Sequence, residues 1–117
     1  MDLYRATTSV VSAAHCLSLG RLRTMTKGSP LHAGDMRAQL GQAIDNLETV
    51  LKQAGLALEN VVRLNYYTTD VDKFMEAADV AGERLGKAGC RPASTLLGVS
   101  RLAFPELMIE IEATAVE

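Results

Sequence analysis

The sequence contains no tryptophan, three tyrosines and two phenylalanines, so aromatic side chains contribute little to any core. Aliphatic residues and methionine must fill the interior instead. It also has only two cysteines, Cys16 and Cys90, and no N-terminal order of charged and then apolar residues that would mark a secretory signal. We therefore expect both thiols to be reduced and the protein to be cytoplasmic.

Long apolar runs and an excess of positive charge are missing as well. No stretch approaches the roughly 20 apolar residues that cross a bilayer, which argues against a membrane partner. The net charge is -2, and no basic patch is large enough to neutralise a series of phosphates, which argues against nucleic acid. The histidines and cysteines cannot be assembled into the three or four ligands of a zinc site, so we expect no metal.

The clearest pattern that is present is a period-2 alternation over residues 107–116, which predicts a strand with two different faces. A chain of 117 residues is the size of one domain, and we treat 1–117 as such. One face of this strand is apolar and should be core: Leu107, Ile109, Ile111, Ala113 and Ala115. The other face is mixed, as in a partly buried wall where chemistry could take place: Met108, Glu110, Glu112, Thr114 and Val116.

Apolar residues at spacings of three and four predict two amphipathic helices. The first covers 35–54, with Asp35 as its N-cap and Gly55 as its stop. The second follows Thr69, which we expect to be its cap, with Asp72 completing a variant of the capping box. The buried stripe of the first helix is Met36, Leu40, Ala43, Ile44, Leu47, Val50 and Leu51, and that of the second is Val71, Phe74, Met75, Ala78, Ala81 and Leu85.

The remaining periodic segments read as strands, which gives an α/β chain of the α+β type. Alternation predicts strands over 61–68, with Val62, Leu64 and Tyr66 on one face, and over 94–102. Weaker patterns predict strands at 3–11 and 15–20, followed by a loop over 21–34. Two helices can cover only one face of such a sheet. The other face is therefore expected to meet a second copy of the chain.

From about Gly28 to the end, an ordered series of motifs resembles the Rid family, also called YjgF/YER057c/UK114. The motifs are Ala38-Gln39-Leu40, Ala43-Ile44-Asp45-Asn46-Leu47, Val61-Val62-Arg63-Leu64, Tyr67-Thr68-Thr69-Asp70, Arg91-Pro92-Ala93, Gly98-Val99-Ser100-Arg101-Leu102 and Glu110-Ile111-Glu112-Ala113-Thr114-Ala115-Val116.

The resemblance implies a chorismate-mutase-like (YjgF-like) fold, with a mixed sheet and two helices on one face. It also implies a homotrimer in which three sheets form a central barrel and three clefts lie between subunits. Many members hydrolyse reactive enamines and imines to a 2-oxo acid and ammonia, with no cofactor and no metal. Some carry an older label as ribonucleases (endoribonuclease L-PSP). The implied ligand is a small molecule such as a 2-imino or 2-oxo acid.

Ser94 is the most informative departure from the family pattern. In deaminating members the residue after Pro-Ala is an arginine that binds the substrate carboxylate, whereas here Ser94 follows Pro92-Ala93. A guanidinium forms a charged, bidentate clamp, and a serine hydroxyl offers one neutral hydrogen bond. Hydrogen bonds to charged groups are worth roughly 1.5–3 kcal/mol each, so affinity for a carboxylate should fall by orders of magnitude. Arg91 could lean in as a substitute, as could an N-terminal arginine of a neighbouring subunit.

The other site residues are carried over from the resemblance one by one. Glu110 matches the family carboxylate that handles water and protons, so it is the expected general base. Leu96 matches a position whose backbone groups hold the substrate. Tyr4 is the candidate for the tyrosine of the first strand that closes the cleft. Glu112 has no such role in this reading, and we expect it to be structural and paired with Arg63.

Two functions of different class remain open on the sequence alone. One is an enamine or imine deaminase that uses Glu110 on substrates needing no carboxylate clamp. The alternative is a non-catalytic small-molecule-binding or regulatory trimer that has lost the chemistry. A chorismate-mutase-like isomerase would need cationic side chains facing a dianion, and the missing arginine argues against it.

Overall fold

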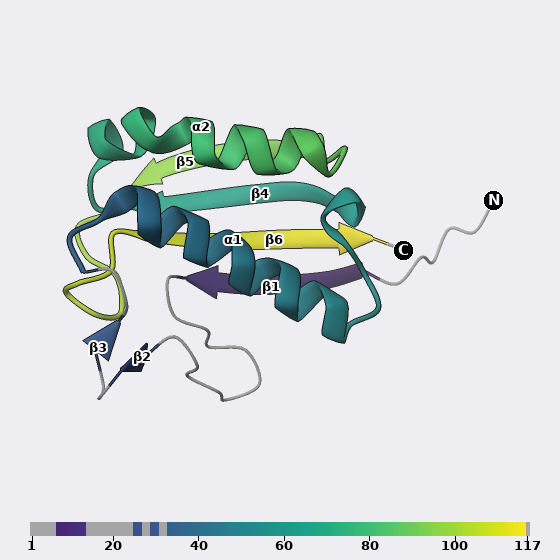
Figure 1. The fold of residues 1–117 in the computed structure, drawn as a ribbon, viewed down its shortest axis with the longest axis horizontal. Coiled ribbons are helices and arrows are strands. Elements are labelled where there is room, and N and C mark those ends of the chain that lie inside the picture. Colours follow the sequence, from purple (N-terminus) through teal and green to yellow (C-terminus); the bar gives the residue numbers. More distant parts are fainter. Residues whose placement is uncertain (1–6, 14–24, 27–28, 31–32, 117) are drawn as a thin grey trace.

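The computed structural model describes residues 7–13, 25–26, 29–30 and 33–116. Two helices lie against one face of a four-stranded sheet whose order is β1-β6-β4-β5 (Figure 1). β6 pairs antiparallel with both β1 and β4, and β4 pairs parallel with β5. The elements are β1 (Thr7–Ala13), β2 (Met25–Thr26), β3 (Ser29–Pro30), α1 (Met36–Gln53), the short 3₁₀ helix η2 (Leu58–Asn60), β4 (Val61–Thr68), α2 (Val71–Lys87), β5 (Ala93–Gly98) and β6 (Ile109–Val116).

The expected α+β fold with a mixed sheet and two helices on one face is confirmed. The pairing of β4 with β5 is parallel because α2 carries the chain back across the sheet between them. Within the expected loop over 21–34, β2 and β3 form a separate two-residue ladder. The strand expected at 15–20 lies outside the described residues. The helices of the described chain include none that is long and apolar enough to cross a membrane.

α1 begins and ends as its sequence predicts. The Asp35 carboxylate accepts a hydrogen bond from the Ala38 N–H at 3.0 Å, which satisfies one of the free amides of the first turn. Gly55 ends the helix at a φ of 74°, a conformation that glycine adopts without steric cost. The predicted apolar stripe is buried, apart from the half-buried Val50. Two polar side chains that the pattern did not predict, Gln39 and Asn46, are buried with it.

The prediction that Thr69 caps α2 is wrong, because the cap is Asp70. Its carboxylate accepts from the Lys73 N–H at 3.0 Å. The Thr69 N–H still donates to the carbonyl of Met108, directly after the end of β4, and the helix starts one residue later than predicted. The predicted stripe is also partly wrong: Val71 is 41% and Met75 60% exposed, whereas Phe74, Ala77 and Ala81 form the buried face.

β4 has the predicted span, but a β-bulge changes the alternation of its first residues. Val61 pairs with Ala115 and Arg63 with the adjacent Thr114, so Val62 is the extra residue on this strand. Val61 is therefore buried. Val62, which was expected on the same face as Leu64 and Tyr66, is 50% exposed. From Leu64 onward the alternation follows the prediction, with Leu64 and Tyr66 buried.

The last two strands are shorter than predicted, and the connection between them is anchored by buried side chains. β5 ends at Gly98 rather than 102, and β6 starts at Ile109 rather than 107. Gln39 is fully buried and clamps this connection: its amide donates to the Glu106 carbonyl and accepts from the Met108 N–H, both at 2.8 Å. The Thr68 hydroxyl donates to the Met108 carbonyl at 2.7 Å. The N–H and the carbonyl of Met108 are thus both hydrogen-bonded to side chains that are distant in sequence, Gln39 of α1 and Thr68 of β4.

Replacement of Gln39 by leucine is expected to lower the free energy of unfolding by about 2–6 kcal/mol. The leucine fits the buried site by volume but leaves the Met108 N–H and the Glu106 carbonyl without partners, and each such loss costs about 1–3 kcal/mol. Urea denaturation at equilibrium measures the change. Gln42→Leu, one turn along at a half-buried position, is the control. Equal losses for the two variants would contradict the clamp.

Candidate functional site

The open face of the sheet, opposite the helices, carries the carboxylates of β6. Glu110 and Glu112 are both half-buried there, alternating with the fully buried Ile109, Ile111 and Ala113. The expectation of one core face and one mixed, partly buried face on this strand is therefore confirmed. The alternation fixes both carboxylates on the same side of the sheet, about 7 Å apart along the strand.

Glu112 is held by two side chains of the adjacent strand β4. Its Oε1 accepts from Asn65 Nδ2 at 3.0 Å and from the Tyr67 hydroxyl at 3.3 Å. The register explains this arrangement, because Asn65 lies directly opposite Glu112 and Tyr67 directly opposite Glu110. The sequence reading missed both residues. Their alternation on β4 gives the signal, since Asn65 and Tyr67 are the polar positions on the face opposite Leu64 and Tyr66.

The expected pairing of Glu112 with Arg63 is wrong. Arg63 Nη2 donates to Thr95 Oγ1 on β5 at 2.7 Å. The bulge at Val62 places Arg63 opposite Thr114, so its side chain leaves from a position two pairs further along the ladder than Glu112. Among the ion pairs between described residues, none involves Glu110 or Glu112.

The electrostatics of this face favour the protonated form of Glu110. Its partial burial raises its pKa above the ordinary value, and the negative charge of Glu112 raises that pKa further. The pKa of Tyr67 is also raised, first by loss of water contact and then by the charge of Glu112. A carboxyl group that gives and takes a proton closer to neutral pH is suited to acid–base chemistry.

The other predicted site residues do not gather around Glu110 within one copy of the chain. Ser94 lies opposite Leu64 on the helix side of the sheet and is exposed at the β5 edge. Leu96 lies opposite Tyr66 and packs against the core on that same side. Arg91 is exposed and precedes β5. Tyr4 is outside the described residues. A site that uses both Ser94 and Glu110 therefore has to be completed around the sheet edge or by another copy.

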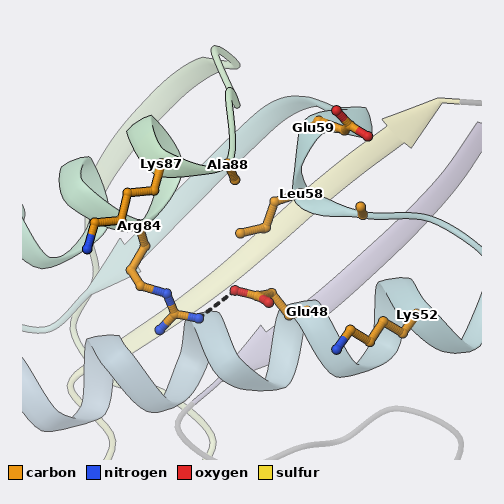
Figure 2. A pocket seen from close by; sticks show the side chains of 8 residues that line it. Glu48, Lys52, Leu58, Glu59, Arg84, Lys87 and Ala88 are labelled. Carbon is orange, nitrogen blue, oxygen red and sulfur yellow. Dashed lines mark hydrogen bonds and ion pairs between the residues drawn. The ribbon is translucent and has the colours of Figure 1, made fainter.

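A hollow of about 450 Å³ lies on the helix side, between the C-terminal halves of α1 and α2 (Figure 2). Figure 2 shows the Arg84 guanidinium directed from α2 toward Glu48 of α1. Arg84 forms ion pairs with both Glu48 and Asp45, so these charges satisfy one another and hold the two helices together. Because this hollow is on the other side of the sheet from Glu110, we regard it as structural. The described residues contain no group of histidine, cysteine and acidic side chains that could hold a metal.

The topology and the alternating strand β6 define an α+β protein of the YjgF-like fold, and comparison with known proteins identifies its family. The family model described as Endoribonuclease L-PSP matches residues 10–117. RutC family protein PH0854 of Pyrococcus horikoshii is 31% identical over 96 residues, which cover 82% of this chain and 74% of that protein. RutC family protein PYRAB12510 of Pyrococcus abyssi is 34% identical over 82 residues, which cover 70% of this chain and 62% of that protein. The chain belongs to this family, known also as YjgF/YER057c/UK114, RutC or Rid.

Solved structures show the same fold. Rv2704 of Mycobacterium tuberculosis, a YjgF/YER057c/UK114 family member, is 37% identical with a TM-score of 0.66, over 71% of this chain and 69% of that one. The Rid-family protein YyfB of Yersinia pestis is 33% identical with a TM-score of 0.77, over 100% of this chain and 83% of that one. Escherichia coli TdcF, solved with bound serine, has a TM-score of 0.75 at 20% identity, covering 100% of this chain and 84% of that one; this likeness concerns the fold alone.

Glu110→Gln is expected to raise the free energy of unfolding at neutral pH. Burial and Glu112 raise the pKa of Glu110 in the folded protein above its ordinary value of 4.5. The stability that protonated Glu110 provides is complete below the unfolded-state pKa and is lost as the pH rises through the folded-state pKa. The advantage of the glutamine variant should therefore shrink on acidification. Urea unfolding at a series of pH values measures this, with Glu59→Gln as the control for one lost charge. An advantage for Glu110→Gln that does not change with pH would contradict the prediction.

Proposed function

We propose that this protein is a single-domain homotrimer, cytoplasmic, with small-molecule clefts between its subunits, in which it hydrolyses enamines or imines to a carbonyl compound and ammonia. The observation that carries the proposal is Glu110, a half-buried carboxyl with a raised pKa on a sheet face that the helices leave open. The match of residues 10–117 to the family supports it. The serine-bound structure of TdcF is consistent with a ligand of amino-acid size in this fold.

The placement of the site residues supports assembly. Ser94 and Leu96 lie on the helix side of β5, at the edge of the sheet, whereas Glu110 lies on the open face. A cleft between subunits would allow the edge strand of one copy to approach the open face of another. Assembly would also cover apolar groups on these surfaces, such as the 45% exposed Leu97.

The proposed chemistry needs one proton acceptor that later becomes a donor. Glu110 takes a proton from water as the water oxygen bonds to the iminium carbon and the C=N π electrons move to nitrogen. The same carboxyl then returns a proton to the nitrogen of the tetrahedral intermediate. The C–N bond then breaks with its electron pair on nitrogen while the hydroxyl group of the intermediate gives its proton to the Glu110 carboxylate, which leaves the carbonyl compound and ammonia. Glu110 passes this proton to solvent or to the departing ammonia and is ready for the next cycle. Because Ser94 offers no cationic clamp, we propose that the substrates do not depend on a carboxylate for binding.

Hydrolysis of freshly generated imines, with and without a carboxylate, tests this proposal. We expect release of ammonia above the buffer background, with imines that lack a carboxylate at least as good as imino acids. Glu110→Gln should lose about 100-fold or more of the rate, the usual contribution of a positioned general acid–base. Glu59→Gln is the matched control, because Glu59 is an exposed residue of η2 that lines the hollow on the helix side of the sheet. Absence of ammonia release from a protein shown to be trimeric would refute the deaminase.

Ser94 also gives a specific reason for the alternative function, a binding or regulatory trimer without catalysis. A chain that has lost the arginine of the deaminating members can retain the trimer and the cleft while losing the reaction.

Ser94→Arg distinguishes the two functions. If the cleft is an intact deaminase that lacks its clamp, the new guanidinium should raise kcat/KM for carboxylate-bearing imines by about tenfold or more, since one charged hydrogen bond is worth roughly 1.5–3 kcal/mol. Ser100→Arg adds the same charge at an exposed position beyond the end of β5 and should have no such effect. A Ser94→Arg trimer with no gain would favour the binding protein.

A further inference from the structure

The two carboxylates of the open face have different surroundings. Glu112 accepts hydrogen bonds from Asn65 and Tyr67, at 3.0 and 3.3 Å. Two donors on one oxygen atom fix the orientation of the Glu112 side chain. Glu110, by contrast, lies opposite Tyr67 in the ladder, yet the hydroxyl of that tyrosine is directed to Glu112. Glu112 is thus fixed in place by two donors, and among the described residues no hydrogen bond or ion pair holds the Glu110 side chain in the same way.

Residues of all four strands of the sheet lie around Glu110. On its own strand, Glu112 is the charged neighbour. On β4, Tyr67 lies opposite Glu110 and Asn65 lies two pairs further along, while Arg63 donates to Thr95 of β5. On β1 the partners of Glu110 and Glu112 in the ladder are Ala13 and Val11, which do not ionise. Leu97 of β5 lies beside Tyr67 and is apolar. Within the described residues, Glu112 is therefore the charge that acts on Glu110.

We propose that Glu112 is a positioning residue for Glu110: the anion that Asn65 and Tyr67 hold on the open face makes Glu110 the carboxyl that carries and transfers the proton. The proposal rests on the proposed function for its chemical role. Two carboxyl groups close together rarely ionise with equal ease, and different surroundings assign them different roles. Two donors of β4 hold the Glu112 side chain in place beside Glu110. The raised pKa of Glu110 supports this division, since the charge of Glu112 contributes to it.

Glu112→Gln provides a test that does not depend on catalysis. The glutamine keeps an oxygen atom that can accept from Asn65 and Tyr67, so the variant removes the charge and preserves the packing. In a carboxyl ¹³C NMR titration of the assembled protein, we expect the midpoint of Glu110 to move to lower pH in this variant. Tyr67→Phe should move it in the same direction by a smaller amount, because Glu112 loses one donor and can turn toward water. Glu110→Gln assigns the resonance.

The control is Glu59→Gln, which removes one negative charge from outside the open face and should leave the Glu110 midpoint unchanged. If hydrolysis is observed, the acidic limb of its pH–rate profile should move to lower pH in Glu112→Gln together with the NMR midpoint. A Glu110 midpoint that is the same in wild type and in Glu112→Gln would overturn the inference, whether or not the protein is active. Absence of hydrolysis with a shifted midpoint would refute the deaminase and leave the coupling of the two carboxylates established.

Discussion

Burial of the helix-side residues of β6 is the interaction on which the rest of this structure depends. Ile109, Ala113 and Ala115 are completely buried, and Leu107 and Ile111 are 1% exposed. Because side chains of a strand alternate, this burial places Glu110 and Glu112 on the open face without any further specification. A slip of one residue would exchange the two sets and place two carboxylates in the core. The cost of burying charge makes that alternative register inaccessible, so the same pattern specifies the core and the position of the site.

A polar contact at the start of β6 reinforces that register. Gln39 of α1 and Thr68 of β4 bind the peptide groups of Met108, so the helix layer and the sheet meet at one residue. The side-chain amide of Gln39 can be buried here because both its nitrogen and its oxygen atom form hydrogen bonds. Apolar packing fixes which face of β6 is inside, and these hydrogen bonds fix where along the chain the strand begins.

Local patterns in the sequence predicted much of this fold. The alternation of buried and half-buried residues over 107–116, the cap at Asp35 and the span of β4 each depend on residues that are close in sequence, and each is confirmed. The features that were missed depend on partners far along the chain. The bulge at Val62 exists only in relation to Thr114 and Ala115 of β6. The cap of α2 is Asp70 and not Thr69, whose N–H is bonded to the distant Met108 carbonyl. Asn65 and Tyr67 were missed for the same reason, since their role requires the register between β4 and β6.

The anchored connection between β5 and β6 has a consequence for how the family can vary in length. Residues 99–108 join the two strands, and at their far end Gln39 and Thr68 hold Met108 independently of the path that the chain takes to reach it. Lengthening a flexible loop costs little free energy, because closure entropy grows only slowly with length. Insertions and deletions before Glu106 should therefore be absorbed within the loop, with the strand phase restored at Met108. The number of residues between β5 and β6 can then differ among relatives, while Glu110 keeps its place on the sheet.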